Sequence, residues 1–250
     1  MENQIAESAE IGQGTTLGKL NIIGDNVKIG KNCQIGNNVI IHAGTMIADD
    51  VRIDDRTIVG KLPMRSPRSI FKEEINLKPA EIGNRCQIGS AVIIYAGCQI
   101  GEYNLIADMA TVRENVEIGD YNIIGRGAAI ENYVKIGDRN KLETNCYLTA
   151  YSRVEDYCFI APCVATSNDN YMGRDPERFK HFRGVTVKTG GRIGVNSTVL
   201  PGKVIEEDGM AGGGSVITTD IPSGEIWLGN PARSRGKVPE KQLLDNNLDK

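Results

Sequence analysis

The chain has 250 residues, a length that one large domain can fill, and its 29 basic against 32 acidic side chains give a net charge of −3. This near balance argues against a nucleic-acid-binding surface. No apolar run of about 18 residues could span a membrane, and the opening sequence MENQIAESAE lacks the basic start and apolar core of a signal peptide, so we expect a cytoplasmic protein without a membrane partner.

An aliphatic side chain recurs at every sixth position of the first block, which runs from about Ile5 to Gly60. A period of six fits neither a helix face nor an alternating strand, so it indicates a repeat architecture. We expect a coil of very short parallel strands, in which the aliphatic residue and a small residue four places later point inward. The aliphatic positions are Ile11, Leu17, Ile23, Ile29, Ile35, Ile41, Ile47, Ile53 and Val59.

The period then breaks at a first excursion, residues 61–81, which carries three prolines and no repeat. Long irregular segments inside a compact array are often functional loops. This one is either a solvated excursion or a flap whose Arg65 and Arg68 contact a phosphorylated substrate.

Fourteen further hexads run without a slip from Ile82 to Ala165. Five of the six cysteines occupy the inward small position of a hexad, and Cys163 lies one place earlier in its own. We therefore predict buried thiols in a reducing compartment and no metal site. The five are Cys33, Cys86, Cys98, Cys146 and Cys158.

A second excursion, residues 166–186, precedes the last hexads, which resume at Val187 and end near Ile217. Roughly thirty hexads would make about ten coils if three complete a turn. We assign residues 1–238 to one all-β parallel helix of hexapeptide repeats. Residues 239–250 would form a short helical tail that covers the open end of the coil.

The last coils carry a family resemblance, in the stretch GRIGVNSTVLPGKVIEEDGMAGGGSVITTDIPSGEIWLGNPAR at residues 191–233. The chain resembles the hexapeptide-repeat acyltransferases, which implies a left-handed parallel β-helix assembled as a homotrimer. The two excursions and the Asn-Asp-Asn of residues 168–170 are similar to the dTDP-3-amino-3,6-dideoxyhexose N-acetyltransferases. That resemblance implies transfer of an acyl group from acetyl-CoA to the amine of a dTDP- or UDP-linked amino sugar, for surface polysaccharide.

The resemblance also implies where catalysis would occur, in the groove between neighbouring subunits. Asp169 would accept a hydrogen bond or the proton of the sugar amine, and Asn168 would orient it, although both residues also favour turns. Glu143 follows Leu142 where many hexads have glycine, so it is a second candidate acceptor. His181 is either a catalytic base or a loop contact. His42, the other histidine, would lie on the surface or between subunits.

Binding residues follow from the same resemblance. Asn145 and Tyr147 lie near Glu143 in the sequence and would contact the sugar, with Arg65 and Arg68 on its phosphates. The residues expected to bind coenzyme A are Gly194, Gly212, Gly213 and Ser215 along the pantetheine groove, and Lys188 and Arg233 at the phosphates. Tight bends of the coil would also explain the glycines.

Other activities on the same coil remain open. A sugar O-acetyltransferase would need a base for its hydroxyl substrate. Carrier-protein-dependent acyltransferases of lipid assembly usually place a histidine on a central coil, and residues 82–165 contain none. Carbonic anhydrases of this architecture need three metal-binding histidines, and this chain has two. A non-catalytic β-helix scaffold is the third class of protein that the sequence allows.

Overall fold

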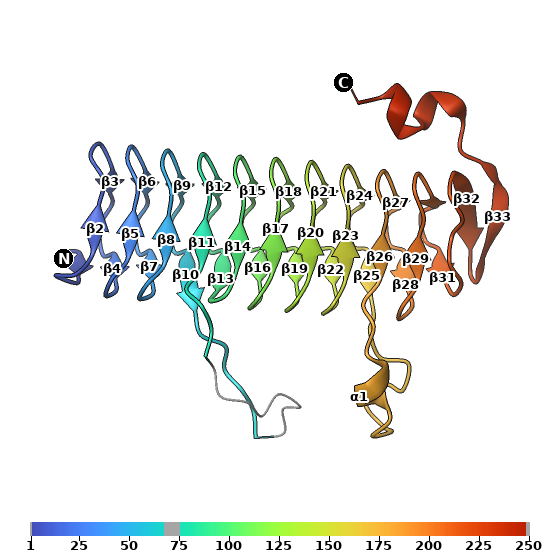
Figure 1. Cartoon of the computed structure of the whole chain (residues 1–250), viewed down its shortest axis with the longest axis horizontal. Coiled ribbons are helices and arrows are strands. Elements are labelled where there is room, and N and C mark those ends of the chain that lie inside the picture. Colours follow the sequence, from blue (N-terminus) through green and yellow to red (C-terminus); the bar gives the residue numbers. More distant parts are fainter. Residues whose placement is uncertain (1, 68–75, 249–250) are drawn as a thin grey trace.

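The computed structural model describes residues 2–67 and 76–248. These residues form one long coil whose three faces are parallel sheets, here named A, B and C in the order in which the chain enters them (Figure 1). Gln4 in the first strand of sheet A pairs with Ile22, 18 residues later, so each turn of the coil uses three hexads. The predicted parallel β-helix is confirmed, and its left hand stays a prediction.

Most strands are only two residues long. Sheet A contains β1 (Gln4–Ile5), β4 (Ile22–Ile23), β7 (Ile40–Ile41), β10 (Ile58–Lys61), β13 (Ile93–Tyr95), β16 (Thr111–Val112), β19 (Ala129–Ile130), β22 (Tyr147–Leu148), β25 (Ala165–Thr166), β28 (Thr198–Val199) and β31 (Val216–Ile217). Sheet B contains β2 (Glu10–Ile11), β5 (Lys28–Ile29), β8 (Met46–Ile47), β11 (Glu81–Ile82), β14 (Gln99–Ile100), β17 (Glu117–Ile118), β20 (Lys135–Ile136), β23 (Arg153–Val154), β26 (Thr186–Val187) and β29 (Val204–Ile205).

Sheet C contains β3 (Thr16–Leu17), β6 (Gln34–Ile35), β9 (Arg52–Ile53), β12 (Gln87–Ile88), β15 (Leu105–Ile106), β18 (Ile123–Ile124), β21 (Lys141–Leu142), β24 (Phe159–Ile160), β27 (Arg192–Ile193), β30 (Met210–Ala211), β32 (Glu225–Gly229) and β33 (Ala232–Lys237). In the described part of the chain the sheets therefore hold 11, 10 and 12 strands, so the coil is somewhat longer than the predicted ten turns.

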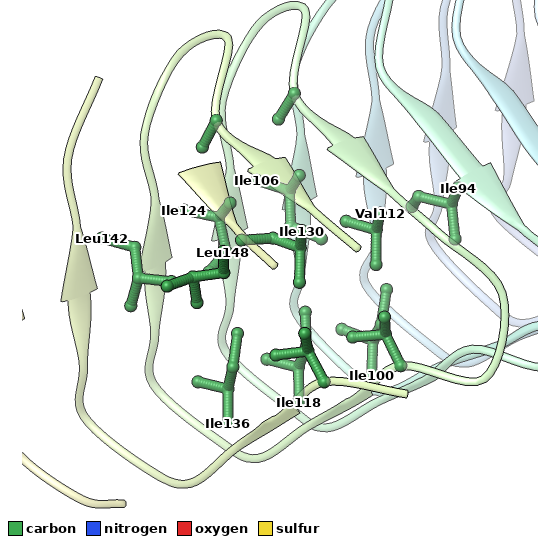
Figure 2. Close-up of a cluster of buried hydrophobic side chains, with 14 of the residues drawn as sticks. Ile94, Ile100, Ile106, Val112, Ile118, Ile124, Ile130, Ile136, Leu142 and Leu148 are labelled. Carbon is green, nitrogen blue, oxygen red and sulfur yellow. The ribbon is translucent and has the colours of Figure 1, made fainter. Parts of the chain in front are cut away.

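The second residue of most strands points into the coil, where the aliphatic side chains stack along the axis (Figure 2). Ile94, Ile106, Ile124 and Ile130 are fully buried. β-branched residues suit this position because their stiff side chains pack well on a pleated surface. The narrow core explains the scarcity of aromatic residues, which make up 5% of the chain.

The inward small residues also bind the backbone of the next coil. The thiol of Cys33 donates to the carbonyl of Ala48 at 3.1 Å, and the thiol of Cys98 donates to that of Arg113 at 2.9 Å, each 15 residues ahead. Thr57 and Asn104 use a hydroxyl and an amide in the same way. The five cysteines at inward positions are buried, as predicted, whereas Cys163, one place earlier in its hexad, is exposed.

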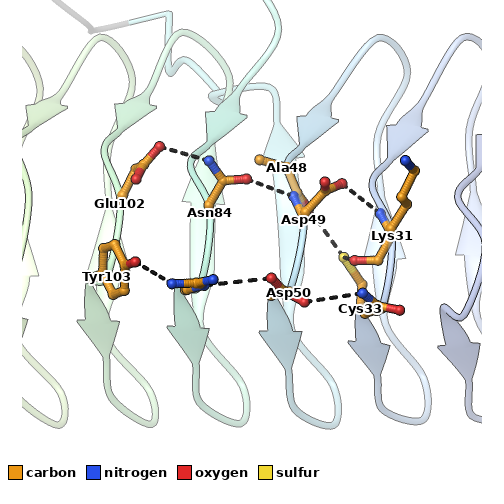
Figure 3. A network of polar contacts seen from close by, with 10 residues as sticks. Lys31, Cys33, Ala48, Asp49, Asp50, Asn84, Glu102 and Tyr103 are labelled. Carbon is orange, nitrogen blue, oxygen red and sulfur yellow. Dashed lines mark hydrogen bonds and ion pairs between the residues drawn. The ribbon is translucent and has the colours of Figure 1, made fainter.

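Polar side chains continue this pairing outside the core, at the corners of the coil (Figure 3). The Asn84 amide donates to Glu102 at 2.7 Å, and its oxygen accepts the Asp49 N–H at 3.0 Å. Asp49 in turn accepts the Lys31 N–H at 2.7 Å. Each coil is thereby tied to the next at its corners as well as along its strands.

Both excursions leave the coil at the corner between sheets A and B, hereafter the A–B corner, and project from the same side of the molecule (Figure 1). The first connects β10 to β11; the second connects β25 to β26 and contains the short helix α1 (Arg178–His181). Strands β13, β16, β19 and β22 separate β10 from β25 in sheet A. Five strand spacings of 4.8 Å place the roots of the two excursions about 24 Å apart.

The C-terminal end of the coil is covered by an antiparallel hairpin, β32 and β33. Two 3-10 turns, η1 (Glu240–Gln242) and η2 (Leu244–Asn246), follow it where the sequence predicted a helical tail. These turns fold back against the side of the coil, since the Leu244 N–H donates to Asp208 at 3.0 Å. No helix in the described residues is long and apolar enough to cross a membrane.

Candidate active site

A cavity of about 230 Å³ lies where the second excursion folds against the A–B corner. The coil contributes side chains from β22 and from the turns that follow β19 and β22. The excursion contributes its beginning, α1 and the residue after α1. The cavity is lined by Glu131, Asn132, Tyr147, Thr149, Ala150, Tyr151, Asn168, Asp169, Arg178 and Phe182. Two predicted catalytic residues, Asn168 and Asp169, and one predicted substrate contact, Tyr147, are therefore brought together.

The Asp169 carboxylate organises the second excursion. Its oxygens accept the N–H groups of Tyr171 at 2.9 Å and Gly173 at 3.0 Å, and its Oδ2 lies 3.2 Å from Nε of Arg178. The side chain is 15% exposed. These partners hold the loop in shape and anchor α1 at the cavity. They also occupy much of the acceptor capacity that a substrate amine would use.

Asn132 and Glu131 form the floor of the cavity on the coil side. Asn132 is 5% exposed, and its Nδ2 has no hydrogen-bond partner. A buried amide donor without a partner is costly, so this one is suited to a ligand acceptor in the cavity. Glu131 is half-buried, and this burial raises its pKa above the ordinary value; Arg113 lowers the pKa and Glu114 raises it further.

A row of charged and aromatic residues leads along the A–B corner from the first excursion to this cavity. Nζ of Lys61 and the guanidinium of Arg113 lie 5.1 and 4.9 Å from the centre of the Tyr95 ring. Arg113 also pairs with Glu114 at 2.8 Å and reaches to 3.7 Å from Glu131. Within this row, the Tyr95 ring lies two turns of the coil before the Glu131 carboxylate.

His181 does not line the cavity. It ends α1, is exposed, and its ring centre lies 6.0 Å from that of Tyr171. Within the chain, the arrangement favours a loop contact over a catalytic base. His42 follows β7 on the A–B corner, near the root of the first excursion, and burial together with Lys61 lowers its pKa.

Glu143 and Asn145 lie on a different edge of the coil. They follow β21 and so belong to the corner between sheets C and A, the C–A corner, whereas Asp169 follows β25 at the A–B corner. Asn145 has φ +57°, a left-handed conformation that asparagine tolerates well. Only Tyr147, on sheet A between the two corners, reaches the cavity. One chain therefore does not unite Glu143 with Asp169.

The residues predicted to bind coenzyme A are also divided between edges. Gly194, Gly212 and Gly213 share the C–A corner, where a Cβ on Gly194 would lie 2.5 Å from the Gly213 nitrogen. The close contact between consecutive coils therefore explains why Gly194 is glycine, and no ligand is needed to explain it. Lys188 follows β26 at the corner between sheets B and C and lies 3.4 Å from Glu155, which raises the pKa of the lysine.

Ser215 and Arg233 are held by the hairpin region. Ser215 is fully buried, and its hydroxyl accepts the Gly229 N–H at 3.2 Å, so its side chain does not reach the surface of this chain. Arg233 lies in β33 and donates to its neighbour Ala232 at 2.8 Å. Arg65 is half-buried near the start of the first excursion. Arg68 falls outside the described residues.

Sequence reasoning missed Glu131, Asn132 and Arg178. The signal for Glu131 was present, because it follows Ile130 at the hexad position that drew attention to Glu143. Arg178 was not recognisable, since its place depends on the fold of a segment without repeats. Among the described residues, no three His, Cys, Asp or Glu side chains are arranged to hold a metal ion.

Comparison with known proteins gives a family and several relatives. The family described as bacterial transferase hexapeptide (six repeats) matches residues 8–41 and 79–114. A stretch of 57 residues is 47% identical to dTDP-3-amino-3,6-dideoxy-alpha-D-galactopyranose 3-N-acetyltransferase of Aneurinibacillus thermoaerophilus, covering 23% of this chain and 30% of that enzyme. A stretch of 64 residues is 41% identical to the mitochondrial gamma carbonic anhydrase 1 of Arabidopsis thaliana, covering 25% and 23%. This chain thus matches less than a third of either relative.

Among solved structures, the UDP-N-acetylglucosamine acyltransferase of Bacteroides fragilis 9343 superposes with a TM-score of 0.57. The match covers 94% of this chain and 73% of that one at 20% identity. At this level of identity the similarity is one of fold.

Proposed function

The chain belongs to the hexapeptide-repeat transferases, and from that premise we propose that it transfers an acyl group from acetyl-CoA to the amine of a nucleotide-linked amino-deoxy sugar. The observation that carries this proposal is the cavity at the second excursion. Its wall combines the carboxylates of Glu131 and Asp169 with the Asn132 amide, which has an unpartnered donor. These groups suit a sugar that offers an amine and hydroxyls. The 47% identical stretch is shared with an N-acetyltransferase of such a sugar.

Glu131 is our candidate for the proton acceptor. The sugar amine attacks the thioester carbonyl, a carbon–nitrogen bond forms, the carbon–sulfur bond breaks, and the amine proton must leave for the product amide to form. A half-buried carboxylate with a raised pKa is a better proton acceptor than an exposed one, because its basicity lies closer to neutral pH. Asp169, held by two backbone N–H groups and Arg178, would shape the loop around the amine.

The remainder of the nucleotide sugar would extend along the A–B corner towards the first excursion. Tyr95 offers a face for the base, and Lys61 beside it offers a cation for the diphosphate. Two strand spacings separate Tyr95 from Glu131, about 10 Å, which a diphosphate and a sugar ring can bridge. This placement assigns the binding of phosphate to Lys61 in addition to Arg65 and Arg68.

The donor would approach from a neighbouring copy in the proposed homotrimer. Glu143 and the glycines of the C–A corner lie on another edge of the coil, so they would join the cavity only across a subunit interface. Orientation of the two substrates in such a groove can supply much of the rate enhancement, about 7–11 kcal/mol in favourable cases. Asn145 and Gly194 of one subunit would then contact acetyl-CoA, and the second excursion of the neighbouring subunit would cover it.

A thiol-release assay with acetyl-CoA tests the proposal. The acceptor panel contains dTDP- and UDP-linked amino sugars, with the hydroxyl analogue of each as a matched control. We expect thiol release with an amino sugar alone. Release with the hydroxyl analogues alone would replace the proposal by sugar O-acetylation. If no acceptor gives release and titration detects no binding of acetyl-CoA, the chain is a scaffold and the proposal fails.

A further inference from the structure

Arg192 lies under the C-terminal segment with most of its guanidinium unused. Its side chain extends from β27 on sheet C, and its Nη1 donates to Oε1 of Gln242 at 3.4 Å. Its Nε and Nη2 are screened from solvent and have no hydrogen-bond partner. A covered guanidinium with two unpartnered nitrogens, which carry three N–H groups, is costly to maintain and calls for an acceptor.

Arg192 is part of the lining of a cavity of about 310 Å³ between the coil and the C-terminal segment. The coil contributes Tyr157, Arg192 and Asp208, and the segment contributes Lys241, Gln242 and Leu244. This volume is at the lower end of the range for small-molecule sites. The cavity lies far along the coil from the row at Tyr95, and it shares no residue with the cavity at the second excursion.

The charges of the cavity favour an anion. Asp208 is the acidic residue of its lining, and both of its carboxylate oxygens accept the Leu244 N–H, at 3.0 and 3.2 Å. In the part of the chain that the structure describes, no ion pair joins Asp208 to Arg192 or to Lys241. The carboxylate therefore anchors the C-terminal segment, while Arg192 of the coil and Lys241 of the segment give the lining two positive charges.

We propose that this cavity binds a phosphate group, either free phosphate or the phosphate of an ester. The planar fork of a guanidinium matches two phosphate oxygens at once, and a lysine adds a second charge for a doubly charged anion. Because Arg192 belongs to the coil and Lys241 to the segment, a bound phosphate would join the two. The proposal does not depend on the acyltransferase activity.

Calorimetric titration of the full-length protein with inorganic phosphate tests the site, with sodium chloride at equal ionic strength as the reference. Adenosine 3′,5′-bisphosphate is titrated in parallel. We expect saturable binding of phosphate that falls at least tenfold in Arg192→Gln and in Lys241→Gln. Equal affinities for the two probes would identify free phosphate as the ligand, and tighter binding of the bisphosphate would identify a phosphate ester.

Arg235→Gln is the matched control, because Arg235 is an exposed cation of β33 outside the cavity. It should bind as the wild type does. Chymotryptic cleavage near Leu243 and Leu244 gives a second readout: phosphate should slow it in the wild type and in Arg235→Gln, but not in Arg192→Gln. The proposal is overturned if neither probe binds above the chloride reference, or if Arg192→Gln binds as tightly as the wild type.

Discussion

At the scale of single residues, the residue that follows each inward aliphatic determines which chemical groups the corners of the coil offer to a ligand. Most such turns carry glycine or a residue paired with its neighbour. Glu131 is half-buried, this burial raises its pKa, and the cavity at the second excursion lies over it. Its charge is balanced only in part by Arg113, 3.7 Å away, which also pairs with Glu114.

Glu131→Gln should lower turnover about 100-fold near neutral pH, because general acid–base catalysis is typically worth about 10²–10⁴-fold. A base must be ionised to act, so wild-type activity should fall as the pH drops through the raised pKa of Glu131. That acid limb should be absent from the pH–rate profile of the variant. Glu117→Gln, at an exposed ion pair with Lys135, is the control.

The same pKa has a consequence for stability. Burial raises the pKa of Glu131 in the folded protein, so protonation stabilises the fold, and this stabilisation is lost as the pH rises through that pKa. The wild type should therefore lose thermal stability relative to Glu131→Gln over that range. Parallel melting curves across the range would contradict this assignment.

Cys158 illustrates an inward residue whose role is structural. Its thiol donates to the Lys188 carbonyl at 3.1 Å, and burial raises its pKa to about 12, so it stays a neutral thiol. Cys158→Ser preserves the donor but buries a more polar group, at a cost of about 1–2 kcal/mol. We expect a lower Tm with unchanged turnover. Lost activity in a fully folded variant would mean that Cys158 takes part in the reaction.

At the scale of elements, the second excursion is held in shape mainly by contacts among its own residues. Asp169 accepts two N–H groups of the loop and pairs with Arg178 of α1, while the loop closes the cavity above Asn132. The hexads predicted where this loop leaves the coil. They did not predict its internal fold, because a segment without a period is shaped by contacts that spacing does not encode.

Asp169→Asn should weaken the Arg178 pairing and cut turnover at least tenfold, while the oligomeric state stays that of the wild type. Limited trypsin digestion should become faster within residues 167–185 only. Asp175→Asn is a control, since Asp175 is exposed and accepts an N–H from Glu177 in the same loop. Undiminished turnover in Asp169→Asn would remove this carboxylate from the mechanism.

At the scale of the whole molecule, the period of 18 residues assigns every hexad to one of the three faces. Residues whose numbers differ by a multiple of 18 therefore share an edge of the coil, so much of the site could be predicted by counting residues. Ser167 is the first residue after β25, where the second excursion leaves the coil, and it stands 36 residues, or two turns, after Glu131. That spacing places Glu131 on the edge from which the loop leaves. Glu143 stands 12 residues, or two hexads, after Glu131, so it occupies the C–A corner instead. The Arg192 cavity could not be predicted in this way, because the C-terminal segment that closes it has no repeat.

Because both excursions leave the coil at the A–B corner, they point in the same direction around the axis of the coil only if a whole number of turns separates them. Removing one complete turn, residues 99–116, should bring the excursions one strand spacing closer, about 4.8 Å, with both still on one edge. Removing a single hexad, residues 111–116, should instead turn one excursion by a third of a revolution relative to the other. A proximity-dependent cross-link between cysteines placed in the two excursions should strengthen with the first deletion and disappear with the second. Insertions and deletions between the loops are therefore compatible with a joint role of the loops only in multiples of 18 residues.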